Sequence, residues 1–90
     1  MQIVQTARFA KVVKKLHTNQ KQDLDTAIHC ILADPTVGEM KIADLAGIRV
    51  YKFKMVGQLT LLAYRFADEV MILTLLAVGS HENFYRDLKK

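Results

Sequence analysis

Apolar residues in the first third of the chain recur at helical spacing. The first stripe, at positions i, i+3, i+4 and i+7, consists of Phe9, Val12, Val13 and Leu16. The second stripe consists of Leu24, Ala27, Ile28, Ile31 and Leu32. Asn19, with Gln22 three residues later, is the expected N-cap of the second helix, and Asp34-Pro35 ends it because proline disfavours helical geometry in the residue before it. With a short β-like segment at Ile3-Val4, the pattern predicts a strand followed by a hairpin of two helices of about 10 to 15 residues each.

From Ile48 the period of the pattern changes to two, which is typical of a β-strand. One face of this strand carries Arg49, Tyr51 and Phe53, and the other carries Val50, Lys52 and Lys54. Gly57 marks a turn before a second strand at 58–66, and a tight connection at 67–69 leads to a continuous apolar strand from Val70 to Val78. The short connections between these three strands predict an antiparallel meander. The preceding segment, 36–47, is predicted to be a loop with one short turn or strand around 40–42.

Together these elements predict an α+β fold in the order β-α-α-β-β-β with a short C-terminal segment. The helical hairpin is expected to pack on one face of a small antiparallel sheet and to leave the other face partly open. Ninety residues have room for one such domain, which we expect to span 1–90.

Composition narrows the class of protein. The chain is 51% hydrophobic and 24% charged, which favours compact folding over disorder. Its longest nearly apolar run, 70–78, is far shorter than the roughly 20 residues of a membrane-spanning helix. The first residues contain neither a basic leader nor a long apolar stretch, so the cytoplasm is the expected compartment. Cys30 is the only cysteine, and its place on the predicted apolar face of the second helix predicts a small core residue.

The net charge of +4 is concentrated in two segments that contain no acidic residue. The segment 1–22 carries Arg8, Lys11, Lys14, Lys15 and Lys21. The segment 48–66 carries Arg49, Lys52, Lys54 and Arg65. Such clustering predicts a polyanion or an acidic protein as partner, although a solvated face gives the same pattern. Lys11, Lys14, Lys15 and Arg49 are the candidates for RNA binding in this reading.

Sequence motifs for nucleotide or metal chemistry are absent. The chain has no glycine-rich phosphate loop and no Ser/His/Asp motif. Its histidines, His17, His29 and His81, have no second ligand at helical spacing. The sequence therefore predicts neither a metal nor a cofactor.

Candidate chemistry gathers near the end of the last predicted strand. Lys52 and Lys54 project from one face about 7 Å apart, close to the spacing of successive phosphates, and Arg65 follows on the next strand. His81 and Tyr85 come after the last strand. RNA cleavage requires a group that takes the proton of a ribose 2′-OH, positive charge on the phosphorane, and a proton for the leaving oxygen. These five residues supply such groups, whereas the structural alternative is that His81 caps a terminal helix and Tyr85 packs on the core.

An ordered set of short motifs resembles the RelE/ParE superfamily of bacterial type II toxins. These motifs are Asp34-Pro35, Asp44-Leu45-Ala46-Gly47, Arg49-Val50-Tyr51-Lys52-Phe53-Lys54, Leu62-Ala63-Tyr64-Arg65-Phe66 with Asp68-Glu69, and Val78-Gly79-Ser80-His81-Glu82-Asn83-Phe84-Tyr85. The resemblance implies a helical hairpin on a compact sheet. It also implies a cognate antitoxin, often acidic, with which the toxin forms a hetero-oligomer. The basic first helix is then expected to contact either ribosomal RNA or that antitoxin.

The RelE-like branch cleaves mRNA in the ribosomal A site without metal. Lys52 and Lys54 match the basic strand residues of RelE, Tyr85 matches its C-terminal tyrosine, and His81 resembles the tail histidine of YafQ-like relatives. The arginine that RelE carries early on its next strand aligns with Leu61, and Arg65 lies on the same predicted face about 13 Å further along.

The ParE-like branch keeps the fold but poisons DNA gyrase by binding, and it requires no RNA-cleaving residues. We favour a ribosome-dependent mRNA endoribonuclease because Lys52, Lys54, His81 and Tyr85 occur together. A gyrase-binding inhibitor is the first alternative, and an inert nucleic-acid-binding or adaptor domain is the second.

Overall fold

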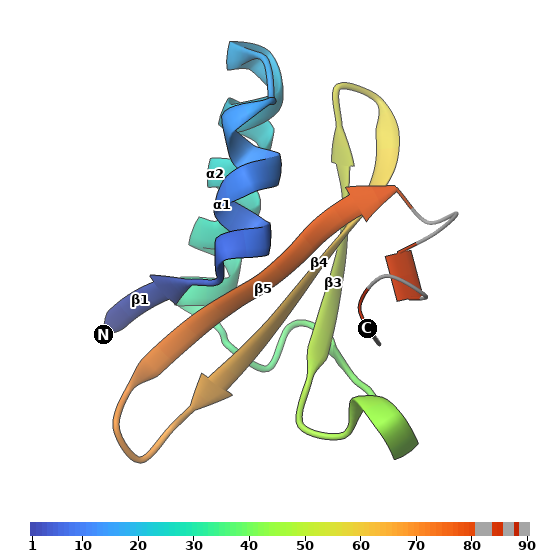
Figure 1. Ribbon diagram of the computed structural model, residues 1–90. Helices are drawn as coiled ribbons and strands as arrows, with labels where there is room; N and C mark the ends of the chain where they lie inside the picture. Colours follow the sequence, from blue (N-terminus) through green and yellow to red (C-terminus); the bar gives the residue numbers. More distant parts are fainter. Residues whose placement is uncertain (81–83, 86–87, 89–90) are drawn as a thin grey trace.

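The computed structural model describes residues 1–80, 84, 85 and 88, and its strands form one five-stranded sheet (Figure 1). The strands are β1 (Gln2–Gln5), β2 (Glu39–Met40), β3 (Arg49–Met55), β4 (Gln58–Ala67) and β5 (Ile72–Ser80). The helices are α1 (Ala7–Lys14), α2 (Thr18–Ala33) and the short 3-10 helix η1 (Ala43–Leu45). The predicted α+β class and the helical hairpin on a sheet are confirmed.

The sheet order is β1-β5-β4-β3-β2. The pairs β3–β4 and β4–β5 are antiparallel, as predicted for the meander, and β2 adds an antiparallel pair with β3 that the sequence did not predict. The pair β1–β5 is parallel, so the sheet is mixed rather than wholly antiparallel. Short connections fix the antiparallel direction of the other strands. No short connection links β1 to them, because the two helices follow β1 in the sequence, and its direction is therefore not fixed in this way.

Both helices cover one face of the sheet, with α1 against β5 and α2 against β3 (Figure 1). The helices contribute Phe9, Leu24, Ala27 and Ile31 to the buried cluster on this face. The strands contribute Met55, Leu62, Tyr64, Leu73, Leu75 and Val78. The two predicted stripes therefore form the helix side of this core. None of the helices in the described part of the chain has the length and apolar character needed to cross a bilayer.

The start of α2 differs from the prediction. Its N-cap is His17, whose backbone N–H donates to Oε1 of Gln20 across 2.8 Å, and the predicted N-cap Asn19 lies inside the first turn. The sequence offers Gln20 and Gln22 as equivalent N3 partners, and the apolar stripe begins too late to choose between them. The predicted end at Asp34-Pro35 is confirmed, since the helix ends at Ala33.

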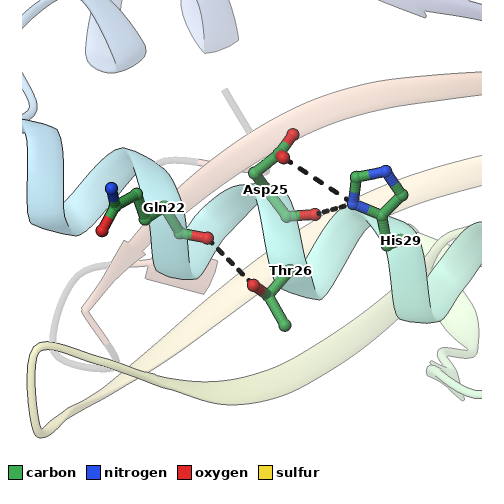
Figure 2. A network of polar contacts seen from close by, with 4 residues as sticks. All are labelled: Gln22, Asp25, Thr26 and His29. Atoms are coloured by element: carbon green, nitrogen blue, oxygen red, sulfur yellow. Dashed lines mark hydrogen bonds and ion pairs between the residues drawn. The ribbon is translucent and has the colours of Figure 1, made fainter.

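The solvent face of α2 carries polar side chains that interact within the helix (Figure 2). The Thr26 hydroxyl donates to the Gln22 carbonyl across 3.1 Å. Nδ1 of His29 lies 2.9 Å from the Asp25 carbonyl oxygen and 3.7 Å from a carboxylate oxygen of Asp25. His29 therefore belongs to the surface of α2.

Cys30 is exposed, so the prediction that it is a core residue is wrong. It lies three residues after Ala27, at the margin of the apolar stripe rather than at its centre. A hydrogen bond with Cys30, together with burial, raises the pKa of Tyr51 on β3.

A buried tyrosine fixes the connection between α2 and β2. The hydroxyl of Tyr64, which is fully buried, donates to the Pro35 carbonyl across 2.7 Å and accepts from the Gly38 N–H across 3.0 Å. Nη1 of Arg49 donates to the carbonyls of Thr36 and Gly38 at 3.2 and 2.9 Å. Burial raises the pKa of Tyr64, so its hydroxyl stays protonated and can donate. Asp34-Pro35, one of the family motifs, thus has a structural role in the fold.

The turn predicted at Gly57 is confirmed as a two-residue hairpin loop between Met55 and Gln58. Val56 and Gly57 both have positive φ, 49° and 79°, as a type I′ turn requires. The Val56 N–H donates to a carboxylate oxygen of Asp23 on α2 across 2.7 Å, which ties the hairpin tip to the helix. The last strand begins at Ile72 instead of Val70, because 68–71 form the turn that precedes it.

Candidate active site

The sheet face opposite the helices is partly covered by the C-terminal segment. Its buried cluster contains Leu45, Ile48, Val50, Leu61, Ala63, Ala77 and Phe84. Packed against this cluster are Leu76, Tyr85 and Leu88. Residues 84, 85 and 88 therefore lie on the face that the sequence predicts to be partly open, and they limit which part of it a ligand can reach.

Phe84 fixes the position of this segment relative to the strands. Its Cδ1 lies 3.9 Å from the place that a Cβ atom on Gly79 would occupy. Gly79 pairs with Leu61, and Leu61 pairs with Lys52, so the three form one row across β5, β4 and β3. Adjacent strands are about 4.8 Å apart, so the backbone at Lys52 lies roughly 10 Å from the strand that Phe84 contacts.

Lys52 and Lys54 are exposed and lie on the same face of β3 as Val50, as the alternation predicts. Their Cα atoms are about 7 Å apart along the strand. Neither ammonium group forms an ion pair with a carboxylate in the described part of the chain. Among the described residues, these two positive charges therefore have no carboxylate partner, and they lie on the same sheet face as the apolar cluster against which Tyr85 packs.

Tyr85 is half-buried, and its ring meets the ring of Phe84 edge to face at a centroid distance of 5.3 Å and an angle of 88°. Nζ of Lys41 lies 5.2 Å from the centroid of the Tyr85 ring and 3.5 Å from Oε1 of Glu39. Burial by itself lowers the pKa of Lys41, but the hydrogen bond with Tyr85 and the charges of Tyr85 and Glu39 outweigh it and raise the pKa. The raised pKa favours the protonated form of Lys41 at the Tyr85 ring.

Sequence reasoning did not single out Lys41 as a site residue. It lies in the segment without a clear period, among acidic residues. The backbone N–H of Lys41 donates to the Ile48 carbonyl across 2.9 Å, which extends the β2–β3 pairing and puts Lys41 beside the cluster. This pairing is visible only in the structure, and no local sequence pattern indicates it.

The remaining candidates lie elsewhere. Arg65 is exposed on β4, four residues beyond Leu61 and about 13 Å from it along the strand, so the structure does not bring it to Lys52 and Lys54. Arg49 holds the loop carbonyls through its guanidinium. The basic residues Lys11, Lys14 and Lys15 are exposed on α1 and at its C-cap. His81 lies outside the described residues.

Within the described part of the chain, no group of three or more His, Cys, Asp or Glu side chains converges in a way that would hold a metal ion. The described side chains on this face that can take part in chemistry are the ammonium groups of Lys41, Lys52 and Lys54 and the hydroxyl group of Tyr85. Two lysines can bind a phosphate, and Tyr85 with Lys41 can hold or transfer a proton beside it.

The fold resembles that of E. coli RelE in the intact RelBE toxin–antitoxin complex, with a TM-score of 0.71 and 22% identity over 90% of this chain and 96% of that one. A free mutant of E. coli RelE gives a TM-score of 0.72 with 21% identity, covering 97% of this chain and 87% of that one. The YoeB/ParE toxin of Agrobacterium tumefaciens gives 0.71 with 16% identity, covering 90% and 99%. Curated protein sequences gave no match.

The family follows from the sequence itself. Residues 3–89 match the family described as the ParE-like toxin of type II bacterial toxin–antitoxin systems. The chain belongs to this family and is a toxin of a type II toxin–antitoxin system. The resemblance to the RelE/ParE superfamily that the motifs indicate is confirmed.

Proposed function

We propose that this toxin is a ribosome-dependent mRNA endoribonuclease that works without a metal and inhibits translation. The observation that carries the proposal is the pair Lys52 and Lys54, two exposed ammonium groups without carboxylate partners in the described residues, on the face that also holds Tyr85. A surface that only packed against a protein would not require two adjacent lysines aligned along one strand.

The roles follow from the chemistry of the groups. Lys52 and Lys54 stabilise the negative charge that develops on the phosphorane. His81 takes the proton of the 2′-OH or delivers one to the leaving oxygen, since imidazole titrates near neutral pH. Tyr85 orients a base or assists proton transfer, and Lys41 keeps positive charge at its ring.

We also propose a cognate antitoxin as partner in a hetero-oligomer. E. coli RelE is found with RelB in an intact toxin–antitoxin complex, and a RelE mutant binds an antitoxin RelBc peptide. The exposed cations on α1 and at its C-cap, Lys11, Lys14 and Lys15, suit either an acidic antitoxin segment or ribosomal RNA.

A second candidate is a ParE-like inhibitor that binds DNA gyrase without cleaving RNA. Two observations favour it. The family match is to ParE-like toxins. Leu61, which aligns with an arginine of RelE, is fully buried next to Lys52 in the sheet, so no cation stands at that position.

His81→Ala separates these candidates. The nuclease proposal predicts that the variant folds, still binds the antitoxin, and no longer arrests growth or produces new mRNA 5′ ends after induction. A gyrase inhibitor would retain toxicity in this variant and would block supercoiling by purified gyrase. Undiminished mRNA cleavage by the variant would contradict the role given to His81.

A further inference from the structure

Arg65 lies away from Lys52 and Lys54, and its surroundings indicate a different role. It lines a hollow of about 280 Å³ at the edge of the sheet face that carries the two lysines. The other residues around this hollow are Thr6, Arg8, Ile48, Leu76 and Leu88. Two arginines from separate elements, Arg8 of α1 and Arg65 of β4, thus border one concave site.

The electrostatics of this hollow favour an anion. Arg65 forms no ion pair with any described residue. Thr6 is the N-cap of α1, its hydroxyl donates to the Leu76 carbonyl across 2.9 Å, and the first turn of α1 contains no acidic residue. The positive end of the α1 dipole therefore adds to the charge of Arg65. Guanidinium groups bind phosphate through paired N–H donors.

The position of the hollow relates it to the lysines. Arg65 lies four residues along β4 from Leu61, the partner of Lys52, which is about 13 Å. This is roughly twice the interval between Lys52 and Lys54, the interval that suits successive phosphates. The tail residues Tyr85 and Leu88 pack on the cluster that extends between these two places.

We propose that Arg65 and Arg8 form a second phosphate subsite, which binds the substrate RNA strand about two nucleotides from the bond above Lys52 and Lys54. The apolar side chains of Ile48, Leu76 and Leu88 provide a floor on which a ribose or base can lie while its phosphate meets the arginines. This inference rests on the proposed ribonuclease function. An acidic segment of a protein partner is the competing occupant, but it gives no reason for the spacing from the lysines.

Binding of single-stranded RNA tests the subsite. The probes are 2′-O-methyl oligonucleotides of one sequence, which cannot be cleaved, shortened by one nucleotide at a time from either end. The affinity of the wild-type toxin for the probe should drop in one sharp step, at the one length at which the phosphate that reaches the hollow is removed. Arg65→Gln should weaken binding of the long probe about three- to tenfold, abolish that step, and reduce the slope of log K against log salt by about 0.7. Arg8→Gln should act in the same direction.

Lys21→Gln is the matched control, because it removes one exposed positive charge from α2 on the helix side of the sheet. It should change RNA affinity by less than about twofold and keep the step. If Arg65→Gln still shows the stepwise loss of RNA affinity on shortening the probe, the subsite is overturned. The subsite is also overturned if Arg65→Gln binds RNA like the wild type and loses affinity only for the antitoxin. Cleavage of ribosome-bound mRNA by the wild type is measured in parallel. Absence of cleavage by the wild type overturns the proposed function. Normal cleavage by the wild type, together with an unchanged affinity step in Arg65→Gln, overturns the subsite alone.

Discussion

The ammonium group of Lys41 lies 5.2 Å from the centre of the Tyr85 ring. This contact joins the loop before β3 to the C-terminal segment, two parts of the chain that are far apart in sequence. Together with the packing of Phe84 against Gly79, it holds the segment on the sheet face that carries Lys52 and Lys54. The tail and the basic strand therefore form one surface.

Lys41→Met should loosen this surface. Loss of the cation at the ring is expected to lower the free energy of unfolding by about 0.5–1 kcal/mol. Cleavage by the variant should fall about tenfold, because Tyr85 loses its positioning contact. Lys41→Arg keeps a cation at the ring and should retain most of the activity. Denaturant unfolding and cleavage of ribosome-bound mRNA measure the two effects, and equal loss of activity in both variants would contradict the role of the charge.

Gly38→Ala should destabilise the fold by about 2–3 kcal/mol. A Cβ atom at this position would lie 2.7 Å from the hydroxyl and 2.8 Å from Cε1 of the fully buried Tyr64, so the ring would have to move and its two hydrogen bonds would weaken. Gly79→Ala is the control, since its new Cβ would meet Phe84 at 3.9 Å, an ordinary contact. Its free energy of unfolding should stay within about 0.5 kcal/mol of the wild type, and comparable losses in both variants would contradict this account.

Val56→Asn should stabilise the protein by about 1 kcal/mol. Valine is strained at a φ of 49°, whereas Asn-Gly is the preferred pair for a type I′ turn. Urea unfolding midpoints measure the change. Val70→Asn replaces an exposed valine in the β4–β5 connection, where φ is not positive, and should have almost no effect. A Val56→Asn variant less stable than the wild type would show that the turn geometry is wrong.

Asp34 should make stability depend on acidic pH. Hydrogen bonds from the hydroxyl and the backbone N–H of Thr36 lower the pKa of Asp34 in the folded protein, and the charge of Arg49 adds to this. Because the folded pKa is below the unfolded one, this stabilisation is present above about pH 4 and is lost as the pH falls through the folded pKa. Urea midpoints measured between about pH 6 and 3 should fall less steeply for Asp34→Asn than for the wild type. Parallel curves would contradict the assignment.

Periodicity was sufficient to predict most of the fold. The stripes around Phe9 and Ile31 predict the helices because burial on one side requires 3.6-residue spacing, and the alternation around Lys52 predicts both faces of β3. Periodicity says nothing of a strand's partner, which is why the parallel pairing of β1 with β5 appears only in the structure. Periodicity also locates the edge of an apolar stripe poorly, which explains why Cys30 was predicted to be buried although it is exposed.

The candidate site was predictable only where it lies on regular strands. Lys52 and Lys54 share a face because of the pleat, and this needs no tertiary information. The position of Arg65 relative to them depends on the β3–β4 register, which the hairpin loop fixes. The contact between Lys41 and Tyr85 depends on how the C-terminal segment packs on the sheet, and no local pattern encodes that packing.

The most direct test of the proposed function uses purified ribosomes programmed with a defined mRNA, with primer extension to map new 5′ ends. The wild-type toxin should cut in the A-site codon in the presence of a chelator. The double variant Lys52→Gln/Lys54→Gln should lose at least about a hundredfold in rate, while Lys21→Gln cuts at the wild-type rate. Absence of new ends with the wild type, or equal cutting by the double variant, would contradict the claim that these two lysines serve RNA cleavage.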